Sequence, residues 1–469
     1  MNIVTLSEMP QSAGLHREWN LLAEKMQPAE IFYTYEWSLA TSRAYGHERR
    51  PLLLLGYSNG VLAGVAALAI CGNRRVEFMN ANTADYCDFI TTPEHCPEFV
   101  RCALAELRRM GMRSIVLTNL PGESPTSKIF DSRSNRCGFH KFCRKAYDCA
   151  QVQLATPEQR ETVRQSLAGK KGVRRDLTAL AREGELRVKH LRAQDELADV
   201  LTEFFCAHVA RFLDKGRISN IARPERRLFL SELARLLSDA GWMRLSMLMS
   251  GERKIAWNYG FEFGGSWFWY QPTFDTAWGR HFPGFCLLTM LVREAADGGG
   301  INRIDLGLGD ENYKTRLATT HRETVHVTIS RSYASHVKAK WHFGIAQRVK
   351  KMPRLESVLR TIMRPGWTTR APKDETDLAD WAAADRQKCH DAVSTEPVTL
   401  ELLARVVMHY SNDEKILAYA LRAANNLRSS SRRGFAEVNS DHIPVKIFWR
   451  PDGGELLHKG VPALREAKI

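Results

Sequence analysis

Residues able to do chemistry gather after a strand-like run near position 305. The segment IDLGLGDENYKTRL places Asp310, Tyr313 and Lys314 within five positions, just after Gly307 and Gly309. Glycines at a strand end let a ligand approach the backbone closely. A carboxylate, a phenol and an ammonium can together move protons between an amine or hydroxyl and a leaving thiolate. The alternative interpretation is a surface turn with solvated charges. The segment lacks the GxGxxG and GxxxxGK phosphate loops.

A second group of such residues comes just before an expected helix. The stretch PTFDTAWGRHFPGF contains Asp275, then Arg280 and His281, and then a Pro-Gly step at Gly284 followed by Phe285. A helix N-terminus presents unpaired N–H groups and the positive end of the helix dipole, which suits a pyrophosphate. The alternative is that the Pro-Gly step only starts the helix.

Two further sets of polar residues allow a substrate to be bound. Asp85, Tyr86 and Asp88 could hold an amine or a sugar, or they could only cap a loop. The basic run KKGVRRDL at 170–177 could clamp an acidic substrate, or it could be a solvated helix face.

The elements that must position these residues occur twice in the same order. Each copy has a hairpin of apolar runs, further strand-like pieces, a helix and a closing strand. The first hairpin turns at Asn59-Gly60, which is a strong hairpin signal, and the second turns near Ser250-Gly251. This order predicts an α+β unit used twice. In the first copy the helix spans 97–110, and in the second copy it spans 284–298.

The second copy resembles the acetyltransferase domain of CelD/BcsL-type proteins of the GNAT superfamily. The resemblance rests on WNYGFEFGGSWFWYQPTFD, on the Pro-Gly step and on AADGGGINRIDLGLGDENYK, and in the first copy on FYTYEWSLA, PLLLLGYSNGVLAGVAALA and DYCDFI. FemAB-like transferases pair two such domains and carry a similar aromatic-Lys step. The resemblance implies two tandem GNAT-like domains with mixed, mainly antiparallel sheets flanked by helices, plus a C-terminal helical extension. The expected boundaries are 1–150, 151–330, 331–397 and 398–469.

The resemblance also implies an activity and roles for the residues. An acyl group would move from acyl-CoA, with acetyl-CoA favoured, to an amine or hydroxyl of a small molecule or glycan precursor of an exopolysaccharide or envelope pathway. The resemblance implies no metal, and it implies that the cofactor is bound by Arg280, His281, Gly284 and Phe285. Asp275 or Asp310 would take the proton from the nucleophile, Tyr313 would orient or protonate, and Lys314 would contact a phosphate or carboxylate. The substrate would be bound by Asp85, Asp88 and Tyr270. The phosphate loop departs from the family pattern because its glycine comes one place late.

Two other functions remain open from the sequence. One is a FemAB-like transfer of an aminoacyl group from tRNA to a peptidoglycan precursor, which the basic charge fits. The other is a degenerate GNAT-like scaffold that binds a partner without turnover, which the altered phosphate loop favours.

Charge and cysteine usage indicate a location. The net charge is +14, and residues 331–370 hold ten basic residues against one acidic residue. Residues 331–363 are predicted to form a basic amphipathic helix that could lie on an anionic membrane or pack on the second domain. Scattered cysteines, no long apolar run and no secretory signal predict a cytoplasmic protein, with peripheral association at the inner membrane as a further expectation.

Overall fold

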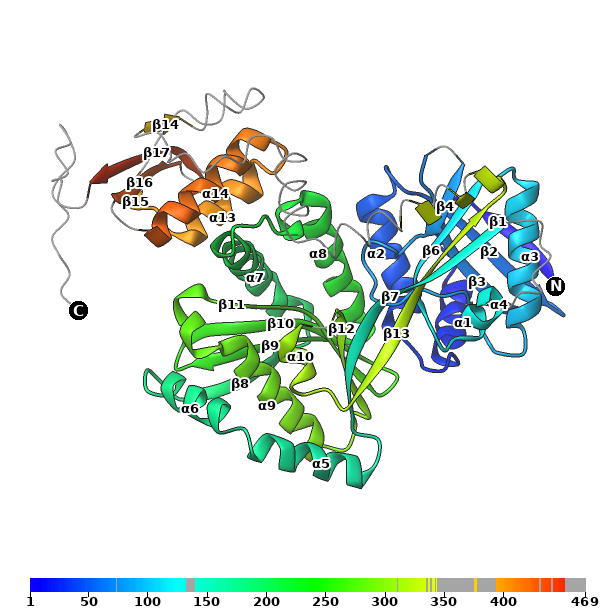
Figure 1. Cartoon of the computed structure of the whole chain (residues 1–469), viewed down its shortest axis with the longest axis horizontal. Coiled ribbons are helices and arrows are strands. Elements are labelled where there is room, and N and C mark those ends of the chain that lie inside the picture. The colour runs from blue at the N-terminus through cyan, green and yellow to red at the C-terminus, as the bar shows by residue number, and fades with distance from the viewer. Residues whose placement is uncertain are drawn as a thin grey trace. The chain divides into compact units, whose positions relative to one another are not determined.

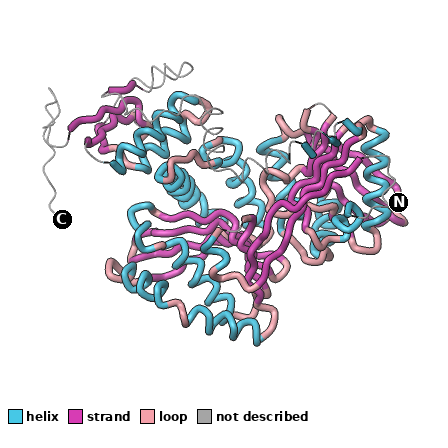
Figure 2. The backbone as a smooth tube through the Cα atoms, in the orientation of Figure 1, coloured by secondary structure: helices cyan, strands magenta, loops and turns pink. Residues whose placement is uncertain are grey.

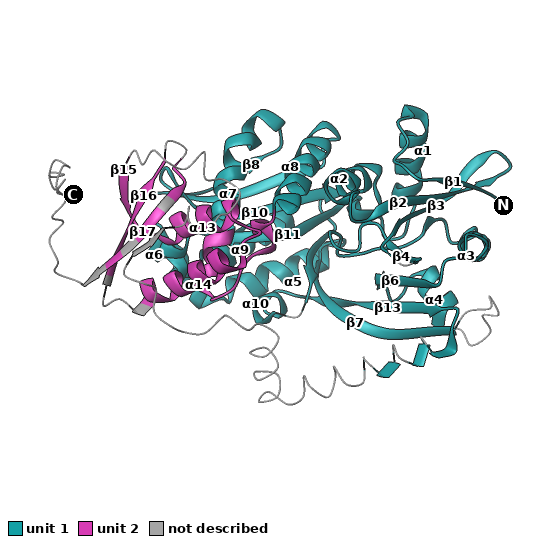
Figure 3. Cartoon of the chain, turned by 90° about the horizontal axis from the view of Figure 1, so that it is seen from above, with its two compact units in different colours: residues 1–208, 224–363 teal, residues 209–223, 364–469 magenta. Residues whose placement is uncertain are grey.

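The computed structural model describes residues 1–72, 74–131, 140–309, 311–334, 336–337, 340–341, 343, 375–377, 394–429, 432–439 and 442–451. The chain divides into two compact units (Figure 3). Unit 1 comprises residues 1–208 and 224–363, and unit 2 comprises residues 209–223 and 364–469. Most of the basic helix and linker predicted over 331–397 lies outside the described residues. Within the described part of the chain, no helix is long and apolar enough to cross a membrane.

The first half of unit 1 is a mixed sheet in the order β1-β2-β3-β4-β6, in which only the pair β4 and β6 is parallel. The predicted β2–β3 hairpin turns at Asn59 and Gly60, which both have positive φ, as a tight hairpin turn requires. The strands are β1 (Asn2–Leu6), β2 (Arg50–Ser58), β3 (Val61–Ile70), β4 (Arg75–Phe78), β5 (Ile90–Thr91) and β6 (Ser114–Pro121). The helices are α1 (Ala13–Glu24), η1 (Ile31–Tyr33), α2 (Tyr35–Tyr45), α3 (Cys96–Arg109) and α4 (Pro125–Asp131).

The second half repeats this plan in the order β8-β9-β10-β11-β12, again with only the last pair parallel. The predicted α+β architecture, with a mixed and mainly antiparallel sheet flanked by helices in each half, is therefore confirmed. The strands are β8 (Leu186–Leu191), β9 (Met243–Ser250), β10 (Arg253–Phe263), β11 (Ser266–Phe274) and β12 (Arg303–Leu308). The helices are α5 (Pro157–Ala168), α6 (Lys171–Leu180), α7 (Gln194–Asp214), α8 (Pro224–Asp239), η3 (Thr276–His281), α9 (Pro283–Asp297) and α10 (Asn312–Thr315).

Two long strands join the halves into one sheet of thirteen strands. β7 (His140–Gln153) follows the first half in sequence but pairs with β12 of the second half. β13 (Thr320–Ser330) follows the second half but pairs with β6 of the first half, and β7 and β13 also pair with each other. The strands therefore run as one continuous band through unit 1 (Figure 2). The sequence does not predict this exchange of strands.

Helix α9 is the central buried helix of the second half. It begins at Pro283, which suits the first turn because its missing N–H would have no partner there. Its side chains Leu287, Leu288, Leu291 and Val292 are buried in a core that includes Trp269 of β11. Each such leucine contributes roughly 1.5–3 kcal/mol by leaving water. This packing fixes where the N-terminus of α9 lies against the sheet.

Unit 2 is a small α+β body (Figure 1). Its four strands pair in the order β14-β17-β16-β15, so the extension predicted to be helical also contains a sheet. The buried Trp449 donates a hydrogen bond from Nε1 to the hydroxyl of Tyr419, over 3.0 Å. The elements are η2 (Asn220–Ala222), β14 (Glu375–Asp377), β15 (Ser394–Pro397), α13 (Leu400–His409), α14 (Glu414–Ser429), β16 (Arg432–Val438) and β17 (Pro444–Pro451).

Candidate active site

The N-terminus of α9 is preceded by the short 3-10 helix η3. The predicted catalytic residue Asp275 caps η3, since its side chain accepts a hydrogen bond from the N–H of Ala277 over 2.9 Å. The predicted cofactor residue Arg280 is exposed and donates from Nε to His281 over 3.0 Å. The chain then enters α9 through Phe282, a 60 % exposed side chain on a left-handed backbone. Asp275 therefore has a structural role in addition to any chemical one.

Basic groups surround this end of α9. The guanidinium of Arg316 lies 4.5 Å from the ring centroid of Phe285, another predicted cofactor residue. The ammonium of Lys170 donates to the carbonyl of Arg316 over 2.9 Å. Burial lowers the pKa of Lys170, and the neighbouring charge of Arg316 lowers it further. Lys170, Arg280 and Arg316 could balance the phosphates of a nucleotide, because excess positive charge beside a helix N-terminus favours an anion.

The loop after β12 carries the other predicted catalytic residues. Lys314 of α10 is buried, and its ammonium donates to the carbonyl of Leu308 over 2.6 Å and pairs with Glu311 at 2.7 Å. These contacts close the loop upon itself. The hydroxyl of Tyr313 accepts a hydrogen bond from Nε1 of Trp269 over 3.4 Å. Asp310 lies outside the described residues.

Asp85 of the first half lies against this loop. A Cβ atom added to Gly307 would lie 2.8 Å from Oδ2 of Asp85, so the missing side chain leaves the space that the carboxyl group approaches. The pKa of Asp85 is raised to about 7, chiefly by burial and then by the nearby Asp305, although Lys314 and Arg226 act to lower it. A carboxyl group with this pKa is half ionised at neutral pH, which suits a general base.

Asp305 fixes the geometry between the two halves. Its Oδ2 accepts hydrogen bonds from Tyr86 over 2.8 Å and from Gln151 over 2.7 Å. Its Oδ1 accepts the N–H of Gly307 over 2.8 Å. Tyr86 is adjacent in sequence to Asp85, so this single carboxylate holds Asp85 and Gly307 in place together. The local sequence does not indicate this role of Asp305.

Tyr270, a predicted substrate residue, lies deep beside Arg226 of α8. Nη2 of Arg226 donates to the hydroxyl of Tyr270 over 2.8 Å, and that hydroxyl donates to the carbonyl of Thr83. Burial raises the pKa of Tyr270, so the phenol stays protonated. Among the residues that the structure describes, Nε and Nη1 of Arg226 have no hydrogen-bond partner. Arg226 thus adds positive charge behind Asp85, and nothing in its local sequence indicates this.

Asp88, the other predicted substrate residue, is buried. Its carboxylate accepts the N–H of Phe89 over 2.7 Å. Burial raises its pKa to about 6, although hydrogen bonds from Thr126 and Ser124 lower it. The structure therefore places Asp88 within the loop rather than beside Gly307.

An ion-pair network holds the first half to the two strands on either side of β7. Glu30 is fully buried and accepts hydrogen bonds from Arg303 over 3.1 Å and from Arg322 over 2.5 Å. Arg322 also lies over the ring of Tyr86, at 4.3 Å, and donates to Glu123 over 2.5 Å. Removing one partner would leave a buried charge unpaired, which typically costs about 3–5 kcal/mol.

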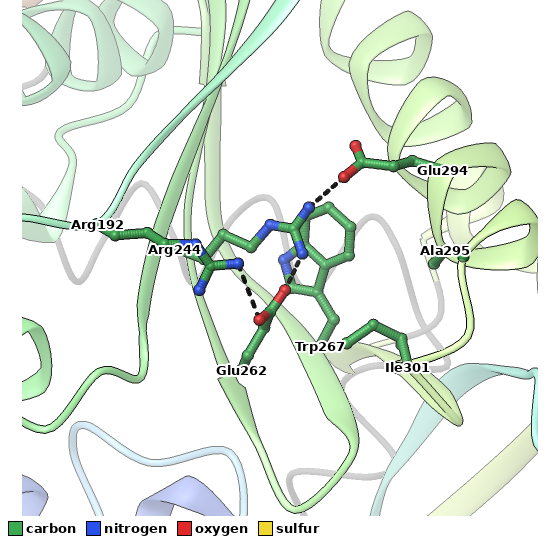
Figure 4. A pocket seen from close by; sticks show the side chains of 9 residues that line it. Arg192, Arg244, Glu262, Trp267, Glu294, Ala295 and Ile301 are labelled. Atoms are coloured by element: carbon green, nitrogen blue, oxygen red, sulfur yellow. Dashed lines mark hydrogen bonds and ion pairs between the residues drawn. The ribbon is translucent and has the colours of Figure 1, made fainter.

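A pocket of about 290 Å³ lies at the opposite end of α9, near Glu294 and Gly298. Figure 4 shows the guanidinium of Arg244 lying against Trp267, 3.7 Å from the ring centroid, and held by Glu262 and Glu294. The charges lining this pocket are paired with each other. The pocket is not where the predicted cofactor residues lie.

Comparison with known proteins identifies a domain within this fold. Residues 168–315 match the family model of the acetyltransferase (GNAT) domain. The matched residues extend from the end of α5 to α10 and include Asp275, Gly284 and Lys314. No curated protein matches the chain.

Several solved structures are similar to this chain at low sequence identity. FemX is 10 % identical with a TM-score of 0.49, over 70 % of this chain and 97 % of FemX. A tandem GNAT protein from the clavulanic acid biosynthesis pathway is 10 % identical with a TM-score of 0.41, over 71 % and 99 %. A GCN5-related N-acetyltransferase from Sphaerobacter thermophilus is 13 % identical with a TM-score of 0.32, over 69 % and 95 %.

Proposed function

We propose that this chain transfers an acyl group from acyl-CoA to an amine or hydroxyl of a small-molecule or glycan-precursor acceptor. The observation that carries the proposal is the placement of Asp85, with a pKa of about 7, against Gly307 in the matched GNAT domain. The resemblance to CelD/BcsL-type proteins supports an acceptor from an exopolysaccharide or envelope pathway.

The phosphates of the co-substrate would lie at the start of α9. Arg280, His281 and the N–H groups near Gly284 are the groups available to hold them, and Lys170 and Arg316 add positive charge. The exposed Phe282 at the same turn offers an apolar surface. Arg316 lies two residues after Lys314, so the phosphate end and the reacting end of the site belong to neighbouring turns.

Asp85 would act as the general base. Its carboxylate takes a proton from the attacking amine or hydroxyl as the new C–N or C–O bond forms and the thioester C–S bond breaks. The departing thiolate needs a proton, and the hydroxyl of Tyr313 on α10 would supply it. Lys314 would act through structure, because its ammonium holds the carbonyl of Leu308 and thereby the Gly307 turn.

Ligand-induced stabilisation tests the proposal against its rivals. A ligand that binds only the folded chain at 100 times its dissociation constant adds about 2.7 kcal/mol to the free energy of unfolding. We expect acetyl-CoA or a longer acyl-CoA to raise the melting temperature. If only charged tRNA raised the melting temperature, the acyl donor would be aminoacyl-tRNA in place of acyl-CoA. If neither ligand raised it, a binding scaffold without turnover would be favoured.

A pair of variants localises the effect. Arg280→Ala should weaken the stabilisation by acyl-CoA several-fold in concentration, because it removes an exposed cation beside the helix start. Arg101→Ala on α3 removes an equally exposed arginine from the other half of unit 1. Equal losses in both variants would show only a general charge effect. Turnover with a panel of acyl-CoAs and acceptors then identifies the acceptor class.

A further inference from the structure

A stripe of exposed hydrophobic side chains follows the last strand of unit 1. Tyr333 is 66 % exposed, Val337 is 42 % exposed and Trp341 is 72 % exposed. The described residues between 333 and 343 are helical, and positions spaced by four lie on one helix face. These three side chains therefore form a single apolar stripe, which we call the 333–341 stripe.

The neighbouring face of the same segment is fixed to strand β7. The ring of Phe343 lies 5.7 Å from that of Phe142, and the guanidinium of Arg144 lies 4.8 Å from the Phe343 ring. The ammonium of Lys340 lies 6.0 Å from the Phe142 ring. Tyr333 contacts His140 at the edge of this interface, with 5.4 Å between ring centroids. The stripe is therefore presented on a folded support and not on a free peptide.

The sequence that contains the stripe is strongly basic. Within residues 331–370 the sequence has ten lysines and arginines and one acidic residue, Glu356. An apolar stripe flanked by cations matches the interface of an anionic bilayer, where an indole ring sits among the headgroups and lysines pair with lipid phosphates.

We propose that the 333–341 stripe docks unit 1 on an anionic lipid surface. A protein partner is the less favoured occupant, because a stable protein interface takes roughly 20–30 residues on each side and this stripe offers three large side chains. A lipid surface needs no matching partner shape, and a few inserted side chains together with the basic charge suffice for reversible binding. This inference is independent of the proposed acyl transfer.

Sedimentation of the full chain with vesicles tests this proposal. Vesicles of phosphatidylglycerol and phosphatidylcholine should carry down the chain, and vesicles of phosphatidylcholine alone should carry down at least tenfold less. Raising the salt concentration should weaken the binding, because the Debye length falls from about 10 Å at 0.1 M to about 3 Å at 1 M.

Matched variants separate the stripe from the charge. Trp341→Ser and Val337→Ser should each lower the partition coefficient on anionic vesicles, by at least tenfold for Trp341→Ser. Val61→Ser removes a 68 % exposed hydrophobic residue at the β2–β3 hairpin and should leave binding unchanged. Equal binding by Trp341→Ser and the unchanged chain, equal binding to neutral and anionic vesicles, or no binding at all would each overturn the proposal. Unchanged melting temperatures show that the variants are folded.

Discussion

The two halves of unit 1 build the same strand–helix–strand element and end it differently. In the first half, β6 bends through Asn119, a left-handed residue with φ of 55°. Its amide donates to the carbonyl of Ala84 over 3.0 Å, and its Oδ1 lies 3.2 Å from Nε2 of His326. In the second half, β12 bends through Gly307, with φ of 74°. Gly307 has no side chain of its own at that corner, and the carboxyl group of Asp85 approaches the backbone there.

This difference separates a structural corner from the corner that we propose to be reactive. The Asn119 side chain makes hydrogen bonds with Ala84 and His326, so the polar groups of the first-half corner are used within the fold. The glycine in the second half lets a carboxyl group from the other half come close to the backbone. The first half thus supplies the carboxyl group, and the second half supplies the loop and the helix N-terminus. Neither half contains the whole candidate site.

The largest expected effect comes from removing the charge of that carboxyl group. Asp85→Asn keeps the shape of the side chain but cannot accept a proton, so kcat/KM for acyl transfer should fall by about 10²–10⁴-fold. Asp275→Asn tests the rival base, and its loss should be smaller because Asp275 caps η3. Asp199→Asn, at an exposed position of α7, is the control for handling and folding. A larger loss in Asp275→Asn than in Asp85→Asn would move the base to the η3 turn.

The next effect comes from making the two corners alike. Gly307→Ala places a methyl group 2.8 Å from Oδ2 of Asp85 and adds strain at a positive φ. We expect kcat/KM to fall by about tenfold or more, because a small displacement of a catalytic group is costly. Asn119→Gly should instead lower stability by about 1–3 kcal/mol through lost hydrogen bonds and leave kcat of the folded fraction nearly unchanged. Steady-state kinetics and urea unfolding of both variants decide this, and the reverse pattern would break the comparison.

Local sequence signals were enough to predict the repeated architecture. Turn residues such as Asn59-Gly60 fix hairpins over a few positions, and Pro283 marks the start of α9, so these elements follow from short-range preferences. The exchange of β7 and β13 does not follow from such preferences, because the partners of these strands are far away in sequence.

The candidate site was predictable only in part for the same reason. Residues near the β12 end were found because the glycines and charged side chains are adjacent in sequence. The contact between Asp85 and Gly307, the Tyr86–Asp305 bond and the Glu30–Arg322 pair each join positions more than 200 residues apart. Arg226 lies inside an amphipathic helix, where an arginine ordinarily predicts a solvent-facing side chain.

A smaller effect concerns the pH dependence of acyl transfer. Because the pKa of Asp85 is about 7, kcat/KM should rise with pH through about 7 as the base loses its proton. The charge of Arg226 lowers this pKa, as does that of Lys314, whereas Asp305 and Glu30 raise it. Arg226→Met should therefore move this rise of kcat/KM to higher pH, by up to about one pH unit. Arg235→Met, a half-buried arginine of the same helix that pairs with Glu232, should not move it. If the pH dependence of kcat/KM were unchanged in Arg226→Met, the charge of Arg226 would not affect the pKa of Asp85.

The smallest effect is on stability. The pKa of Asp85 is higher in the folded chain than its ordinary value of 3.8, so the folded chain binds this proton more tightly. The corresponding stability is fully present below pH 3.8 and is lost as the pH rises through about 7. The shift corresponds to roughly 4 kcal/mol at most, and partial exposure of the side chain reduces this to about 1–3 kcal/mol. Asp85→Asn stays neutral, so relative to the unchanged chain it should gain that amount between pH 4 and pH 8 in urea unfolding. An equal pH dependence in both proteins would mean that Asp85 titrates as a solvated carboxyl group, and the reactive corner would then lose its base.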